Sequence, residues 1–149
     1  MKRLCVAALL CCALVGQASV AAPAKSAVPA LQVSDAWSRP TPPGITVGAV
    51  YLTIENAGAV ADRLLGASSP TAAAVEFHQS LKAGGVMSMR AVSFIECPAG
   101  AVVKIAPGGL HIMLTGLKGP LVLGSSYPIR LQFRDAGSVS VTVSVQARD

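Results

Sequence analysis

The stretch "YPIRLQFRDAGSVSVTVSV", residues 127–145, decides the fold class. Apolar and polar residues alternate on both sides of the turn "DAG" at 135–137, which is the period of a β-strand with one buried and one solvated face. Two such arms joined by a short turn predict an antiparallel hairpin. Its apolar face would comprise Tyr127, Ile129, Leu131, Phe133, Val139, Val141, Val143 and Val145.

The chain from Leu31 onward carries the same kind of signal. The segment "TVGAVYLTIEN", residues 46–56, is rich in β-branched residues and ends at a turn around 56–58. We expect "GG" at 84–85 and "PGG" at 107–109 to form turns between further short strands. No ten-residue segment keeps a helical period. The pattern predicts one all-β domain over residues 31–149, of the Greek-key sandwich or barrel type.

Residues 1–21 have the pattern of a secretory signal peptide. Two basic residues precede the apolar run 4–15, which is too short to span a bilayer, and small residues follow it. Cleavage after Ala21 fits the small-x-small pattern, and so does cleavage after Ala22, which would leave a proline at the new terminus. We therefore expect a protein exported to the periplasm, in which residues 22–30 form a flexible leader.

A lipid anchor is the alternative interpretation, because Cys11 and Cys12 lie close to the predicted cleavage site. Neither cysteine follows a small residue, which argues against lipidation. Removal of residues 1–21 would leave Cys97 alone and exclude an intramolecular disulfide. Because Cys97 alternates in step with Ile95, we expect a buried thiol there.

Composition and motifs exclude several function classes. The chain beyond residue 21 has ten basic and seven acidic residues, a net charge of +3, and the basic residues are scattered, so no nucleic-acid partner is expected. Its two histidines match no nucleophile-elbow or zincin pattern, and no glycine-rich phosphate loop opens a helix. We therefore predict that the protein is not an enzyme.

The methionines other than the initiator lie in two clusters, and one of these clusters contains a histidine. Met87 and Met89 lie two apart in "GVMSMR", and His111 and Met113 lie two apart in "GGLHIML". If Leu110, Ile112 and Leu114 face the core, the second pair faces outward or into a cleft. Thioether sulfur selects Cu(I) and imidazole suits copper, whereas Mg²⁺ and Ca²⁺ prefer oxygen and structural zinc prefers thiolate. Spacing alone leaves ordinary packing and a copper site both open.

The spacing resembles the signature of the periplasmic copper chaperones called PCu(A)C, H-x10-M-x21-H-x-M. Ten residues separate His78 from Met89, 21 separate Met89 from His111, and one separates His111 from Met113. The surrounding segments "DAWSRPTPPG", "GAVYLTIENAG" and "PGGLHIMLTGLKGPL" also resemble the family, over about residues 31–147. The resemblance implies a cupredoxin-like β-barrel and one Cu(I) per chain, bound by these four residues.

The resemblance also implies a function and partners. Copper would be delivered for assembly of cytochrome c oxidase, with the copper-site subunit of the oxidase and a Sco-type thiol protein as partners. We expect a monomer without stable membrane insertion. Copper sequestration or resistance without an oxidase client is the alternative function, and a purely structural β-domain is the third.

Three further residues have expected roles. Met87 shares a strand face with Met89 and could replace it, although the spacing favours Met89. Glu76 shares a face with His78 and could orient the imidazole through its second nitrogen. Trp37, the only tryptophan, is expected to pack at a strand end.

Overall fold

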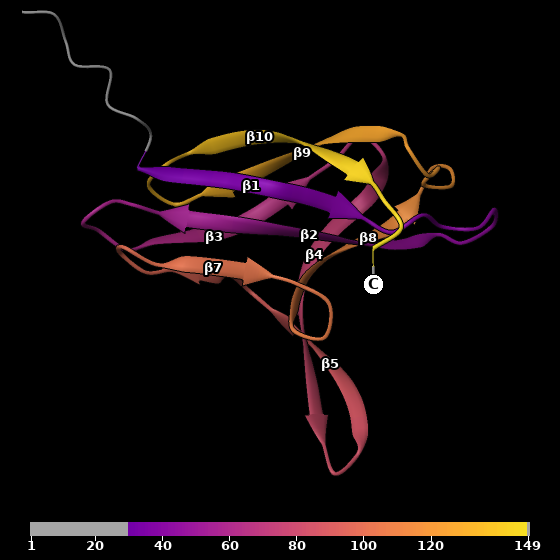
Figure 1. Ribbon diagram of the computed structural model, residues 1–149, viewed down its shortest axis with the longest axis horizontal. Helices are drawn as coiled ribbons and strands as arrows, with labels where there is room; N and C mark the ends of the chain where they lie inside the picture. Colours follow the sequence, from indigo (N-terminus) through magenta and orange to yellow (C-terminus); the bar gives the residue numbers. More distant parts are fainter. Residues whose placement is uncertain (1–29, 149) are drawn as a thin grey trace, which may run out of the picture.

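The computed structural model describes residues 30–148, so the predicted signal peptide and nearly all of the predicted leader lie outside the described residues. This part of the chain is all-β, as predicted (Figure 1). Its strands are β1 (Leu31–Ser38), β2 (Val47–Asn56), β3 (Asp62–Ser68), β4 (Ala72–Ala83), β5 (Val86–Val92), β6 (Ile95–Cys97), β7 (Val102–Ile105), β8 (Leu110–Leu117), β9 (Ser126–Phe133) and β10 (Ser138–Val145). Within residues 30–148 there is no helix long and apolar enough to cross a membrane.

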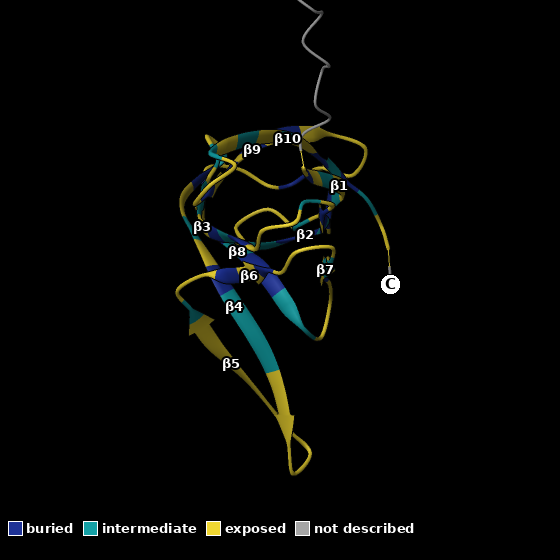
Figure 2. Cartoon of the chain, turned by 90° about the vertical axis from the view of Figure 1, so that its left-hand side faces the viewer, coloured by how far each residue is buried: buried dark blue, intermediate teal, exposed yellow. Residues whose placement is uncertain are grey.

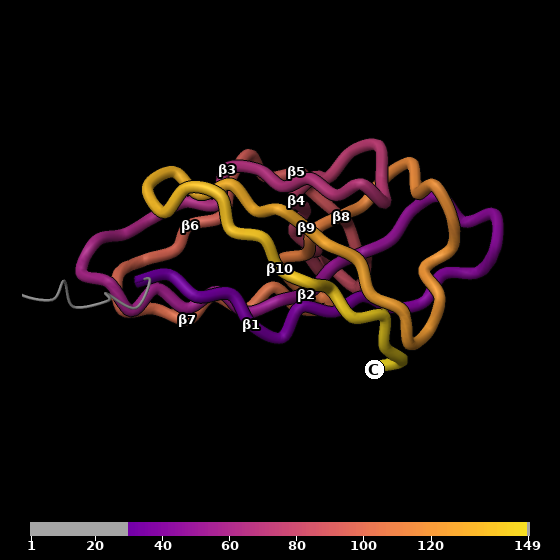
Figure 3. Tube along the Cα trace, turned by 90° about the horizontal axis from the view of Figure 1, so that it is seen from above, coloured from indigo at the N-terminus to yellow at the C-terminus, as the bar shows by residue number. Residues whose placement is uncertain are grey.

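The strands form one strongly curved sheet. Hydrogen bonding follows the order β5-β4-β8-β2-β1-β10-β9-β3-β6, and β7 also pairs with β2. The pair β1–β10 is parallel, and the view from above shows β10 running between β1 and β9 (Figure 3). Since β3 also contacts β4, the sheet curls round on itself and encloses one core. Pairing between strands distant in the chain is what brings β4, β8 and β2 together.

The hairpin predicted from residues 127–145 is the β9–β10 pair, in which Ile129 faces Val141 and Tyr127 faces Val143. Alternate residues of β9 are buried and the others exposed, which confirms the period-2 interpretation. On the other strands, too, alternate side chains point inward, and together they fill the barrel. Its largest fully buried side chains are Phe133, Ile54, Leu64, Ile105, Ile112, Leu114, Ile129, Leu131, Val50, Val143, Val145 and Cys97.

Strands β4 and β5 extend beyond the barrel. We call residues 80–90 the β4–β5 arm; it projects away from the body, and β5 is exposed along nearly its whole length (Figure 2). Gly84 and Gly85 close the tip with φ values of 58° and 83°, a conformation that glycine adopts without steric cost. Because β5 pairs with β4 alone, side chains on the arm keep contact with solvent.

Candidate metal centre

The pairing of β4 with β8 assembles the first half of the site. In this antiparallel register His78 lies directly opposite His111, and Glu76 lies opposite Met113. Directly opposed residues point to the same face of a sheet. The two imidazole rings are accordingly close, with centroids 5.8 Å apart and planes inclined at 43°. Met113 lies on this same face, diagonal to His78.

Met89 reaches this face from β5. Its partner on β4 is Ser80, which makes Met89 a diagonal neighbour of His78, within reach of a long side chain. The backbone N–H of Ser80 donates to the carbonyl oxygen of Gly109 at 3.0 Å. The residues that follow Met89 across the sheet, Ser80 on β4 and Gly109 just before β8, are therefore both small. All four predicted ligands thus lie on one face of three adjacent strands.

A cleft of about 360 Å³ opens on this face. Its lining includes three of the four predicted ligands and is made up of Arg39, Thr41, Val47, Gly48, Ala49, Tyr51, Ser80, Met89, Gly108, His111 and Met113. His78 lies beside the cleft, in a neighbouring hollow that it shares with Glu76 and Ala91. Exposure rises steeply from 8% for His111 to 63% for Met89. The site therefore has a buried side and a solvent side.

Hydrogen bonds define which imidazole nitrogens are free. The Nδ1 atom of His111 is 3.2 Å from the carbonyl oxygen of Gly109, which can only accept, so Nδ1 carries the proton and Nε2 keeps a lone pair. The Nε2 atom of His78 donates to the Glu76 carboxylate at 3.1 Å, which leaves its Nδ1 free. The expected contact between Glu76 and His78 is thus present. Each ring offers one nitrogen to a metal.

The opposite face of β8 fixes the strand in the core. Ile112 and Leu114 are fully buried and Leu110 is half-buried, as the alternation in "LHIML" predicts. On β4, Phe77 is buried in the same way next to His78. Both histidines are therefore carried by strands that cannot shift without opening the core.

The cleft walls from β2 and the segment after β1 were not identified from the sequence. Ala49 is the partner of Met113 on β2, and this pairing places Tyr51 in the cleft. Tyr51 packs on Trp37 with ring centroids 4.8 Å apart, so Trp37 packs near the end of β1, as predicted. Arg39 completes this wall. No motif spacing marks Tyr51; only the β2–β8 pairing places it in the cleft.

The donor set fits a soft metal ion. Within residues 30–148 no group of three or more His, Cys, Asp or Glu side chains is placed to hold a metal. Cys97 is fully buried in β6, as expected, and burial raises the pKa of its thiol to about 11. Two neutral imidazoles and two thioethers are ligands that suit Cu(I).

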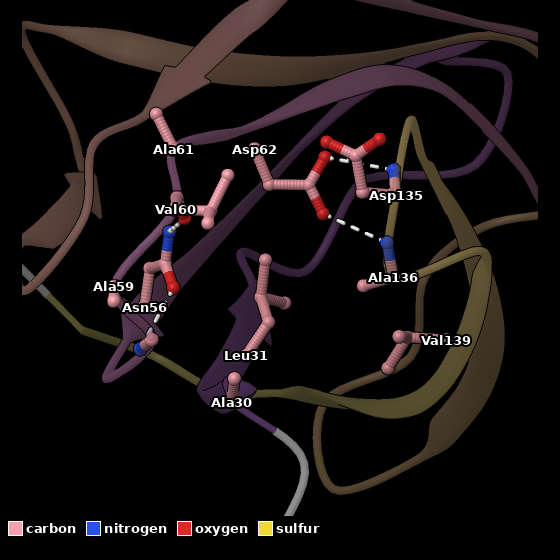
Figure 4. A pocket seen from close by; sticks show the side chains of 11 residues that line it. Ala30, Leu31, Asn56, Ala59, Val60, Ala61, Asp62, Asp135, Ala136 and Val139 are labelled. Carbon is pink, nitrogen blue, oxygen red and sulfur yellow. Dashed lines mark hydrogen bonds between the residues drawn. The ribbon is translucent and has the colours of Figure 1, made fainter.

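A larger cavity, about 460 Å³, is lined by residues near the start of β1 and offers no comparable donors (Figure 4). Its buried carboxylate, Asp62, accepts hydrogen bonds from the backbone N–H groups of Asp135 at 3.0 Å and Ala136 at 2.8 Å. Burial opposes ionisation, but these bonds and one from Arg63 outweigh it and lower the pKa of Asp62. The carboxylate therefore holds the β9–β10 turn in place.

The fold is that of the PCuAC domains. The structure is similar to the copper-bound PCuAC domain from PmoF2, with 27% identity, a TM-score of 0.70, and coverage of 82% of this chain and 97% of that chain. It is also similar to CuI-DR1885 from Deinococcus radiodurans, with 30% identity, a TM-score of 0.65, and coverage of 81% and 80%. The predicted cupredoxin-like fold is confirmed.

The chain belongs to the LpqE-like family, described as "Putative lipoprotein LpqE-like", whose sequence model matches residues 31–145. One relative, "Putative lipoprotein Lxx21020" from Leifsonia xyli subsp. xyli, is 36% identical over 136 residues, which is 91% of this chain and 80% of that protein. Another, "Uncharacterized protein RP573" from Rickettsia prowazekii, is 32% identical over 127 residues, or 83% and 68% of the two chains.

Proposed function

We propose that this protein is an exported metallochaperone that binds one Cu(I) through His78, Met89, His111 and Met113 and delivers it for assembly of cytochrome c oxidase. The observation that carries the proposal is the direct opposition of the two histidines, with both thioethers on the same sheet face. The copper-bound PmoF2 domain and CuI-DR1885, to which the chain is similar, support copper as the metal.

The ligand chemistry favours transfer over storage. Thioethers and neutral imidazoles carry no charge, so a bound Cu(I) keeps its full positive charge, whereas a thiolate would neutralise it. Such a site binds Cu(I) selectively and gives it up to a thiolate acceptor. The Glu76 carboxylate, hydrogen-bonded to His78, places a negative charge beside one of the ligands. A Sco-type thiol protein and the copper-site subunit of the oxidase are the proposed acceptors.

The exposure gradient across the site also supports transfer. His111 is held on the buried side, while the Met89 side chain is mostly in solvent. An acceptor can therefore approach the metal from the Met89 side. A site built for sequestration has no need of an exposed ligand.

Deletion of the gene in its own organism tests the function. Under copper scarcity we expect oxidase activity to fall, and to be restored by the wild-type gene but not by His111→Ala. Arg90→Ala, which changes an exposed residue beside Met89 on the other strand face, is the matched control and should restore activity. A deletion strain that is copper-sensitive but has normal oxidase activity would instead support copper sequestration.

Mass spectrometry of the protein isolated from its own cells tests export. We expect an unmodified chain that begins at Ala22. A lipid-modified Cys11 or Cys12 at the new N-terminus would show that the protein is a lipoprotein, as the description of the family and the name of the Leifsonia relative say of those proteins.

A further inference from the structure

We propose that Met87 is a transit ligand, through whose sulfur Cu(I) passes on its way into and out of the four-ligand site. This inference rests on the proposed function and adds a residue that the four-ligand motif does not include. It concerns the path of the metal along the β4–β5 arm, and not the set of ligands at rest.

The placement of Met87 carries the inference. Met87 and Met89 alternate on β5 and so point to the same face, about 7 Å apart along the strand. Both are mostly exposed, at 56% and 63%, although methionine is ordinarily among the most buried residue types. Met87 lies nearer the tip of the arm than Met89 does, because its pair with Lys82 is next to the last pair of the arm. A metal ion that arrives at the tip of the arm therefore meets the sulfur of Met87 before that of Met89.

The neighbours of Met87 make it a poor resting ligand. Its direct partner across the strand pair is Lys82, whose ammonium group repels a cation on the same face. The partner of Met89 is the neutral Ser80, and His78 is diagonal to it. His78 lies four residues from Lys82 along β4, roughly 13 Å away, so no imidazole can help Met87 to hold copper. Cu(I) would bind there briefly and move on.

The transfer consists of ligand exchange alone. On loading, a bond forms between Cu(I) and the Met87 sulfur while a bond to the incoming carrier breaks. Bonds to Met89 and then to the histidine nitrogens form as the bond to Met87 breaks. Copper remains Cu(I) throughout, and no electron or proton is exchanged. Release follows the same steps in reverse, with an acceptor sulfur taking the metal from Met87.

This path has a specific kinetic signature. Because Met87 is bound in neither the loaded nor the empty state, its loss changes only the barrier between them. Loading and release should therefore slow by the same factor, while the dissociation constant stays the same. A resting ligand behaves differently, because its loss weakens binding.

The test compares the wild-type protein with Met87→Leu and with a double variant, Met87→Leu/Val86→Met. Val86 is exposed at 69% and its partner is Ala83, so the double variant carries a methionine at the tip on the opposite face. Each protein is loaded anaerobically with one equivalent of Cu(I). Competition with bicinchoninate gives the dissociation constant, and stopped-flow transfer to and from this chelator gives the two rates.

We expect both variants to transfer Cu(I) at least about threefold more slowly in each direction, which corresponds to about 0.7 kcal/mol of barrier. Their dissociation constants should match that of the wild type within about twofold. Unchanged rates in Met87→Leu would overturn the inference, and so would full rescue by the methionine at position 86. A tenfold loss of affinity would make Met87 a resting ligand. Failure of the wild-type protein to bind Cu(I) would refute the proposed function itself.

Discussion

Replacement of Asp62 by asparagine should destabilise the barrel without affecting the metal site. Asp62 is 5% exposed, and its two carboxylate oxygens accept three backbone N–H groups, from Arg63, Asp135 and Ala136. An asparagine side chain has one acceptor oxygen and an NH₂ group, which would face a backbone donor. Losing a charge-assisted hydrogen bond and leaving a buried N–H without a partner costs about 2–4 kcal/mol in the free energy of unfolding.

The pH dependence gives this prediction a second test. Because the folded state lowers the pKa of Asp62 below its ordinary value of 3.8, its ionisation stabilises the fold fully above that pH. This contribution is lost as the pH falls through the lower, folded-state pKa. The variant lacks the titrating group. The difference in stability between the two proteins should therefore be constant from pH 7 to about pH 5 and shrink below pH 3.8.

Urea unfolding followed by far-UV circular dichroism between pH 2.5 and 7 measures both effects. Asp135→Asn is the matched control, since that side chain is exposed and makes only a surface ion pair with Arg134, so its loss should change stability by less than about 0.5 kcal/mol. A loss of stability in the Asp62 variant no larger than in the control would refute the reasoning. So would a stability difference that grows on acidification.

Three further predictions concern the site and the core. Glu76→Gln should weaken Cu(I) binding about tenfold in chelator competition, because the carboxylate orients His78; unchanged affinity would contradict that role. Gly116→Ala should lower the unfolding free energy by about 1–3 kcal/mol in urea titration, because φ is +64° and a new Cβ would lie 2.7 Å from that of Ala73. A urea midpoint of the variant equal to that of the wild-type protein would contradict this prediction. Cys97, with a pKa of about 11, should resist iodoacetamide at pH 8 in the folded protein and react in urea; rapid labelling of the folded protein would show an accessible thiol.

The sequence was most informative where local pattern decides structure. Alternation in the segment 127–145 depends only on which face of each strand is buried, so the β9–β10 hairpin and its core residues could be predicted. The same holds for "LHIML", where the burial of Ile112 and Leu114 leaves His111 and Met113 on the other face. These inferences need no knowledge of which strands become neighbours.

The assembled site depends on pairing that no local pattern contains. His78 faces His111 because β4 pairs with β8, although three strands intervene between them in the chain. Tyr51 reaches the cleft because β2 pairs with β8 on its other side. The β-bulge between Ser34 and Trp37 was also not predictable, since it depends on the register between β1 and β2. The spacing in the sequence identifies the four residues, but only the strand pairing shows that they lie close together.

X-ray absorption at the copper edge of the anaerobically loaded protein tests the central claim most directly. With one equivalent of Cu(I), we predict a mixed first shell of two nitrogen and two sulfur atoms, from the imidazoles of His78 and His111 and the thioethers of Met89 and Met113. The double variant Met89→Leu/Met113→Leu should lose the sulfur signal. A first shell of nitrogen and oxygen alone in the wild-type protein would contradict the assignment of methionine ligands.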